Sequence, residues 1–207
     1  MPDFSIEKQY KNPVIGLDDV GRGPLAGPVI SCGCYFKNYT IQEDFYNLIG
    51  DSKKLSEKKR KDSFEFLQNL KQQDIIDYHL GIATVEEIDK LNILEATKLS
   101  MKRVVDKFNL QSAQLIIDGN FSLNYKSYKE QSVIKGDDKS LSIAAASIIA
   151  KVHRDRLMKK LSIRHLHFGW EKNAGYGTKL HIESIHRLGP TIHHRKTFEP
   201  IKSLIHS

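Results

Sequence analysis

The sequence has few of the features that mark secreted and membrane proteins. Its 207 residues include two cysteines, Cys32 and Cys34, which excludes a fold held together by disulfides. Its longest apolar run, 143–150, is interrupted by Ser147 and is far shorter than the roughly 18 residues that a membrane-spanning helix needs. The first residues lack the basic start and apolar stretch of an export signal. We therefore expect a cytoplasmic protein without a membrane partner.

Positive charge is present in excess. Lys and Arg number 32 against 25 Asp and Glu, a net charge of +7, while the apolar (40%) and charged (28%) fractions are those of an ordinary globular protein. The excess is compatible with nucleic-acid binding but does not establish it. The length predicts one monomeric domain over 1–207, with a core at about residues 12–165 and a helical C-terminal extension at about residues 166–207.

Short apolar segments predict the strands of a sheet. Continuous apolar runs at 14–17 and 115–117 are typical of strands buried on both faces. The segment 76–82 alternates between apolar and polar residues, as a half-buried strand does. Two further strands are expected at 29–36 and near 132–134.

Helical patterns fill the intervals between these strands. Helices are expected at 56–72, from Asn92 onward, at 140–160 and at 178–188. Capping-box spacing occurs at Thr84 with Glu87 and at Asn92 with Glu95. The order of elements predicts a mixed-sheet α/β fold with a helical C-terminal extension.

Aspartates stand where apolar strands stop. Asp18 and Asp19 follow one run, Asp118 follows another, and Asp137 and Asp138 precede the long helix. Strand ends meet at one edge of a sheet, so these carboxylates could lie close together. Close carboxylates repel each other, and a hard divalent cation such as Mg²⁺ or Mn²⁺ removes that repulsion. Two such ions support attack on a phosphodiester.

Simpler interpretations of these aspartates remain open. Asp138 could cap the helix, and Asp118 could form a turn. Neighbouring residues of a regular strand face opposite sides, so Asp18 and Asp19 can share a site only if the strand kinks or one carboxylate reaches round its edge. The glycines at 21 and 23 would allow a local kink.

A set of motifs in a fixed order resembles the bacterial ribonuclease HII (type 2 ribonuclease H) family. The resemblance extends from about residue 14 to residue 198, and its blocks are 16–29, 51–55, 92–97, 118–120, 135–137, 143–152, 154–155, 175–178, 181, 189–190 and 194–195. It implies a ribonuclease H-like fold and an endonuclease that hydrolyses the RNA strand of RNA–DNA hybrids. It also implies cleavage 5′ of single ribonucleotides in duplex DNA, which leaves a 3′-hydroxyl and a 5′-phosphate.

The resemblance also assigns roles to individual residues. Asp18, Asp19, Asp118 and Asp137 would be the catalytic set that binds two Mn²⁺ or Mg²⁺ ions. Asp18 would bridge both ions, and Asp137 would help to hold the ion that activates water.

The substrate residues implied in the same way lie in three segments. The backbone of Gly21, Arg22 and Gly23 would grip the RNA–DNA junction. Tyr176 would sense the 2′-hydroxyl and stack on the next sugar, and Lys53 would lie near the substrate. A replication clamp is a conceivable partner, but no clamp-binding peptide is evident after Phe198.

One position departs from the family pattern. The family usually has Glu where this chain has Asp19, whose side chain is shorter by one methylene. We expect retained but weaker activity, with Mn²⁺ favoured because it tolerates looser geometry. The alternatives are a hybrid-binding protein that has lost turnover and a different two-metal nuclease, such as a junction resolvase. The Gly-Arg-Gly and Gly-Tyr-Gly blocks argue against the resolvase.

Other polar residues are given less specific roles. His165, His167, His193 and His194 lack cysteines at zinc-finger spacing, so surface or phosphate-contacting roles are expected. The basic end of the long helix, 151–160, is a candidate phosphate-binding segment.

Overall fold

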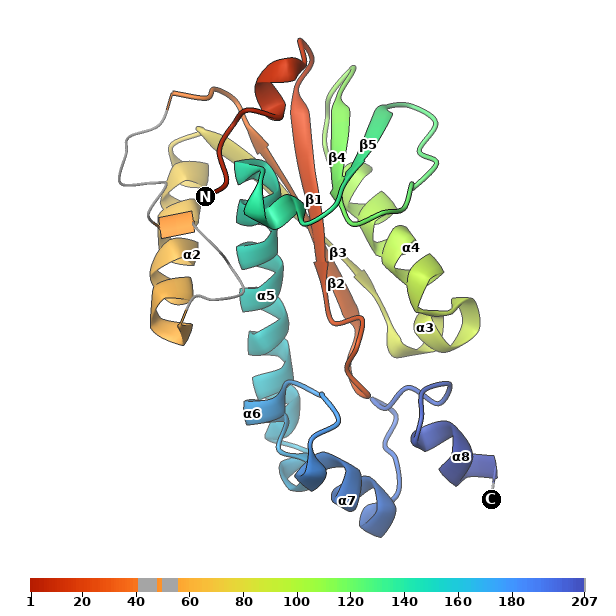
Figure 1. Cartoon of the computed structure of the whole chain (residues 1–207). Helices are drawn as coiled ribbons and strands as arrows, with labels where there is room; N and C mark the ends of the chain where they lie inside the picture. Colours follow the sequence, from red (N-terminus) through yellow and green to blue (C-terminus); the bar gives the residue numbers. More distant parts are fainter. Residues whose placement is uncertain (41–47, 50–55, 207) are drawn as a thin grey trace.

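A mixed five-stranded sheet forms the centre of the molecule. The computed structural model describes residues 1–40, 48–49 and 56–206. The strands are β1 (Val14–Val20), β2 (Val29–Phe36), β3 (Ile76–Ala83), β4 (Gln114–Asp118) and β5 (Lys129–Val133). Their order across the sheet is β3-β2-β1-β4-β5, with β1, β2 and β3 antiparallel and β1, β4 and β5 parallel (Figure 1). The predicted mixed-sheet α/β fold is confirmed.

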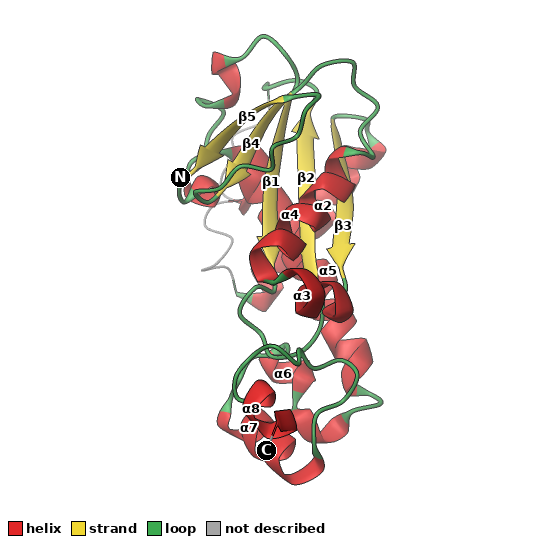
Figure 2. Cartoon of the chain, turned by 90° about the vertical axis from the view of Figure 1, so that its right-hand side faces the viewer, coloured by secondary structure: helices red, strands yellow, loops and turns green. Residues whose placement is uncertain are grey.

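Helices cover both faces of this sheet. They are α2 (Glu57–Gln72), α3 (Val85–Leu91), α4 (Ile93–Val105), α5 (Leu141–Ser162), α6 (Trp170–Asn173), α7 (Lys179–Leu188) and α8 (Ile201–His206), with 3-10 turns η1 (Glu7–Gln9), η2 (Gly136–Asp138) and η3 (Leu166–Phe168). In Figure 2, α3 and α4 lie in front of the sheet, while α2 and α5 lie behind it. None of the helices in the described residues is both long and apolar enough to cross a membrane.

The alternation of side chains on β1 divides the core between these layers. Ile15 and Leu17 pack on Met101 and Val104 of α4. Val14 lies on the other face, where it packs on Ile143 of α5. Asp18 belongs to the same face as Val14, since their positions differ by an even number. The buried aspartate therefore faces α5.

Gly16 lets α5 approach β1 closely. A Cβ atom on Gly16 would lie 2.4 Å from the carbonyl carbon of Ser142 and 2.5 Å from the nitrogen of Ile143. Any larger residue would push the first turn of α5 off the strand. This contact brings the next turns of α5 over the end of β1.

The start of α5 differs from the alternative in which Asp138 caps the helix. Asp138 lies in η2, and the N-cap is Ser140, whose hydroxyl accepts from the nitrogen of Ile143. Glu7 accepts hydrogen bonds from the Ser140 hydroxyl (2.6 Å) and the Ser142 nitrogen (3.0 Å). The N-terminal segment thus holds the beginning of α5 through a buried carboxylate.

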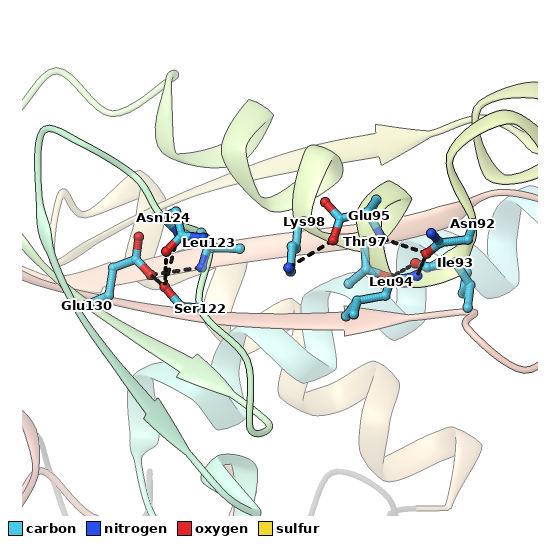
Figure 3. Close-up of polar contacts among 10 residues, drawn as sticks. All are labelled: Asn92, Ile93, Leu94, Glu95, Thr97, Lys98, Ser122, Leu123, Asn124 and Glu130. Carbon is cyan, nitrogen blue, oxygen red and sulfur yellow. Dashed lines mark hydrogen bonds and ion pairs between the residues drawn. The ribbon is translucent and has the colours of Figure 1, made fainter.

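The two predicted capping boxes have different outcomes. Thr84 and Glu87 form the reciprocal pair at the start of α3. At α4 the Asn92 side chain accepts from the nitrogens of Leu94 and Glu95, as Figure 3 shows. The nitrogen of Asn92 itself donates to Ile88, because Asn92 also ends α3. The second box is therefore only a one-sided cap.

The helices after α5 form a separate cluster below the sheet (Figure 2). Its core comprises Leu25, Ala26, Met158, Phe168, Trp170, Ile185 and Ile201. Met158 comes from α5, and Leu25 and Ala26 come from the segment that follows β1. Two parts of the sheet domain therefore anchor the predicted helical extension.

Candidate active site

A cavity of about 440 Å³ opens where β1 and β4 end. It is lined by seven residues that the sequence singles out: Asp18, Asp19, Gly21, Arg22, Gly23, Asp118 and Tyr176. Asp137 is not among the lining residues, and Lys53 lies outside the described residues. The structure thus gathers three of the four predicted metal ligands with two of the three predicted substrate segments.

Parallel pairing places Asp18 beside Asp118. The register aligns Leu17 with Ile117, so the next residue on each strand is an aspartate. Asp18 accepts a hydrogen bond from the nitrogen of Asp19 (2.7 Å), and Asp118 accepts one from the nitrogen of Gly136 (2.7 Å). Residues far apart in sequence thereby present two carboxylates at one edge of the sheet.

Asp19 reaches the same cavity without a kink in its strand. β1 continues to Val20, and both aspartates stay paired with β2, Asp18 opposite Cys32 and Asp19 opposite Ser31. Pairing with β4, however, ends at Leu17. The edge of β1 beyond Leu17 is therefore open toward the cavity, and the carboxylate of Asp19 can reach round it.

The electrostatics of Asp18 favour a bound cation. Its side chain is only 4% exposed, and burial raises its pKa well above the ordinary value for aspartate. The nearby carboxylates of Asp118 and Asp19 raise this pKa further, against a hydrogen bond from Ser147. A divalent cation would lower the pKa of Asp18 again, because it favours the charged carboxylate. Carboxylate oxygens are also the ligands that Mg²⁺ and Mn²⁺ prefer. The donor chemistry fits such an ion.

The predicted metal-binding carboxylates do not form a tight cluster in this structure. Within the part of the chain that the structure describes, no three His, Cys, Asp or Glu side chains are grouped tightly enough to hold a metal. Asp137 is 2% exposed and lies in η2, directly after the Gly136 that donates to Asp118. Its place in the metal set stays a prediction.

The loop that leaves the site after β4 is held by Glu130 on β5. This carboxylate accepts from the Ser122 hydroxyl (2.6 Å) and the Leu123 nitrogen (2.8 Å), contacts drawn in Figure 3. The nitrogen of Tyr125 also donates to it. Phe121 lies in this loop, and the Arg22 guanidinium stands 5.7 Å from its ring centroid.

Tyr176 and the Gly-Arg-Gly turn face each other across the cavity mouth. A Cβ atom on Gly23 would lie 3.5 Å from Cε1 of Tyr176, so the ring lies over a residue without a side chain. The ring is 45% exposed. A half-exposed aromatic ring with a polar tip is suited to stacking on a sugar and reading a hydroxyl.

Ser147, Lys151 and Arg60 also line the cavity. Lys151 begins the segment expected to contact phosphate, whereas Ser147 and Arg60 were not predicted to lie in the site. Ser147 is half-buried, and its interruption of an otherwise apolar helical run was the available signal for a polar role. Lys151 pairs with Asp155 one helical turn away at 2.8 Å. Arg60 belongs to a basic run that has no sequence feature pointing to the site.

The expected exposure of the histidines is wrong for His194. It is 1% exposed and lies against His181 and Trp170 in the core of the C-terminal helices. The absence of cysteines at zinc-finger spacing led to the expectation of a surface or phosphate-contacting role, but internal hydrogen bonds satisfy this ring.

Acidic residues from two adjacent strands share one cavity with a glycine-rich turn and an exposed tyrosine, on a mixed α/β sheet. Fold and site together define a metal-dependent nuclease of the ribonuclease H-like class. The chain belongs to the ribonuclease HII family, whose model matches residues 15–200. Members of this family hydrolyse RNA in RNA–DNA hybrids, so the chain is an endonuclease of that kind.

Relatives cover almost the whole chain. The ribonuclease HII of Wolbachia pipientis subsp. Culex pipiens (strain wPip) is 47% identical over 203 residues, 98% of each chain. That of Macrococcus caseolyticus (strain JCSC5402) is 48% identical over 202 residues, 96% of this chain and 72% of the other.

Solved structures share the fold. The ribonuclease H2 from Pyrococcus horikoshii OT3 superposes with a TM-score of 0.72 at 28% identity, covering 93% of this chain and 96% of the other. The Archaeoglobus fulgidus RNase HII, solved as a complex with PCNA, gives a TM-score of 0.72 at 22% identity over 90% and 95% of the two chains.

Proposed function

We propose that the protein cuts duplex DNA on the 5′ side of single embedded ribonucleotides, as well as the RNA strand of hybrids, and leaves 3′-hydroxyl and 5′-phosphate ends. The observation that carries this proposal is the shared cavity. Carboxylates suited to metal ions and a tyrosine suited to reading a 2′-hydroxyl line the same space. Chemistry and sugar recognition can therefore act on one nucleotide.

Asp18, Asp19, Asp118 and Asp137 would hold two divalent ions, Mn²⁺ or Mg²⁺. When bound, such ions lower the pKa of a water molecule and offset charge on the leaving oxygen. Asp18 and Asp118 come from paired strands and form the rigid part of the set. Asp19 is the adaptable member, because it extends from an open strand edge.

The substrate would enter over the turn 21–23. Arg22 and Lys151 add positive charge beside the carboxylates, which favours a phosphate next to the metal ligands. Tyr176 would lie on the sugar with its hydroxyl near the 2′ position. Because Tyr176 lies in the loop between α6 and α7 of the C-terminal extension, we propose that the core and the extension work as one domain.

The deciding experiment uses a labelled DNA duplex with one ribonucleotide, in Mg²⁺ and Mn²⁺ separately. We expect a single cut 5′ of the ribonucleotide and no cut in the matched all-DNA duplex. Tight binding with no cut in either metal would overturn the proposal in favour of a binding protein. Cleavage of an all-DNA junction would indicate a resolvase.

A further inference from the structure

Two arginines are completely buried beneath the cavity. Arg154 on α5 and Arg195 in the segment between α7 and α8 are both 0% exposed. Among the described residues, neither forms an ion pair with a carboxylate. Asp155 pairs with Lys151, and Asp89 accepts from the backbone nitrogens of residues 196 and 197. A buried guanidinium that bonds only to neutral groups is unusual and calls for a functional explanation.

Arg195 lies inside the turn that follows β1. Its Nη1 donates to the carbonyl of Arg22 (2.8 Å), and its Nη2 donates to the carbonyls of Gly21 and Gly27. Its Nε donates to Gly27 as well (3.0 Å). One guanidinium thus fixes two carbonyl groups of the turn 21–23, which the proposed function assigns to the substrate, and a third at Gly27.

Arg154 joins that turn to the loop that carries the tyrosine. Its Nη2 donates to Ala26 (3.0 Å) and its Nε donates to Pro28 (3.1 Å). Its Nη1 donates to the carbonyl of Ala174 (2.8 Å), two residues before Tyr176. The planar fork of arginine can bridge two segments in this way, whereas the single ammonium of lysine cannot.

The two segments are also in direct contact. The nitrogen of Leu25 donates to Gly175 (2.8 Å), and a Cβ atom on Gly175 would lie 2.5 Å from the oxygen of Ala26. Gly23 and Tyr176 lie at the exposed ends of these segments. Their mutual position therefore follows from the buried contacts below them.

Both guanidiniums remain cationic at neutral pH. Burial lowers the pKa of Arg154 to about 10 and, together with the charge of Arg154, lowers that of Arg195 to about 9. A Lys variant at either position loses the planar fork. Because burial lowers the pKa of lysine as well, such a variant also holds its charge less firmly, so it tests the whole set of contacts made by the guanidinium.

We propose that Arg154 and Arg195 are positioning residues that lock segments 21–28 and 174–178 into one unit, and so set the geometry with which Gly23 and Tyr176 recognise a single ribonucleotide. This inference rests on the proposed function. It assigns ribose specificity to residues that never touch the substrate.

The kinetic test compares Arg154→Lys and Arg195→Lys with Arg187→Lys, an exposed arginine on α7. With the single-ribonucleotide duplex we expect KM to rise roughly tenfold in the first two variants, with kcat within about threefold of the parent. The continuous hybrid should be less affected, since it offers many ribonucleotides. A merely structural defect would lower kcat equally on both substrates, and that result, or unchanged KM, would overturn the proposal.

Amide hydrogen exchange provides a test that needs no activity. In the parent chain, the amides of Leu25, Gly27 and Tyr176 should open with one shared free energy under mild denaturant. In a folded Arg154→Lys variant they should exchange at least about tenfold faster, while amides of β1 and β4 stay unchanged. Independent opening of segments 21–28 and 174–178 in the parent chain would refute the proposal that Arg154 and Arg195 lock them together, even if a Lys variant fails to fold. If the parent does not cut the single-ribonucleotide duplex, the proposed function fails. The exchange result still decides whether the two arginines lock the segments together.

Discussion

The Nε2 atoms of His181 and His194 lie 3.0 Å apart in a buried hydrogen-bond chain. Trp170 donates to Nε2 of His181 (3.0 Å), and the nitrogen of Thr191 donates to Nδ1 of His194 (2.9 Å). His194 must therefore donate from Nε2, and His181 donates from Nδ1 to the carbonyl of Tyr176 (2.8 Å). Each ring has one proton, so the chain holds only while both histidines are neutral.

From this chain of hydrogen bonds we expect the folded protein to lose stability in acid. Burial lowers the pKa of His194 to about 3 and that of His181 below its ordinary value. The unfolded state binds protons near pH 6.5 while the folded state resists them, so stability falls as pH decreases from about 6.5 toward 3. The slope for each histidine is at most about 1.4 kcal/mol per pH unit.

The measurement is the melting temperature between pH 7.5 and 5, followed by the fluorescence of Trp170, the chain's single tryptophan. His194→Gln should flatten the pH dependence in this range. His186→Gln, at an exposed position on α7, should leave it unchanged. Equal slopes for the parent and His194→Gln would contradict the prediction.

Asp18→Asn should abolish cleavage and stabilise the metal-free protein. The substitution removes a buried charge that Asp118 and Asp19 repel, so the melting temperature in EDTA should rise by roughly 2–4 °C, equivalent to about 1 kcal/mol. Activity should fall at least about a thousandfold. Asp138→Asn, at an exposed position in η2, is the matched control and should change neither quantity. A lower melting temperature for Asp18→Asn would show that the carboxylate stabilises the metal-free fold.

Asp19→Glu should shift the metal preference. The extra methylene extends the carboxylate from the open edge of β1, which suits the stricter geometry of Mg²⁺. We expect the rate in Mg²⁺ to rise by up to about tenfold and the ratio of Mn²⁺ to Mg²⁺ rates to fall. An unchanged rate and metal profile would show that the shorter side chain is already compensated.

Tyr176→Phe should weaken cleavage at single ribonucleotides by about tenfold, the value of one hydrogen bond to the 2′-hydroxyl. Tyr176→Ala should cost more, because it also removes the ring that lies over Gly23. The measurement is kcat/KM on the single-ribonucleotide duplex. Tyr125→Phe, a tyrosine bonded to Asp106 away from the cavity, serves as the control. Equal kcat/KM values for the parent and Tyr176→Phe would show that the hydroxyl of Tyr176 takes no part in recognising the sugar.

Sequence patterns predicted the sheet because its central strands are short apolar runs. They predicted the end of β1 too early, since pairing with β2 continues through Asp18 and Asp19 after the apolar run stops. β5 was placed only approximately, because its residues are mostly exposed and polar.

Sequence patterns predicted most of the site residues that line the cavity. They did not predict the buried residues that support the cavity, Arg154 and Arg195. Within the basic segment 151–160, which was expected to bind phosphate, Lys151 lines the cavity, whereas Arg154 is buried and Lys159 pairs with Glu57 at 2.6 Å. A charged side chain that is satisfied by carbonyl groups leaves no local pattern, because its partners come from distant segments. Only the fold identifies Arg154 and Arg195 as interior residues.

α5 fixes the distance between the cavity, which Ser147 lines, and the loop that carries Tyr176, which Arg154 contacts. Ser147 and Arg154 lie on this 22-residue helix about two turns apart, so both project from nearly the same side. One inserted residue between them would swing Arg154 by about 100° and carry it away from its carbonyl groups. The distance between the carboxylates and the loop that carries Tyr176 is therefore set by the number of residues in this part of α5. An insertion or deletion in this segment of α5 would therefore break the contacts of Arg154 with the two loops.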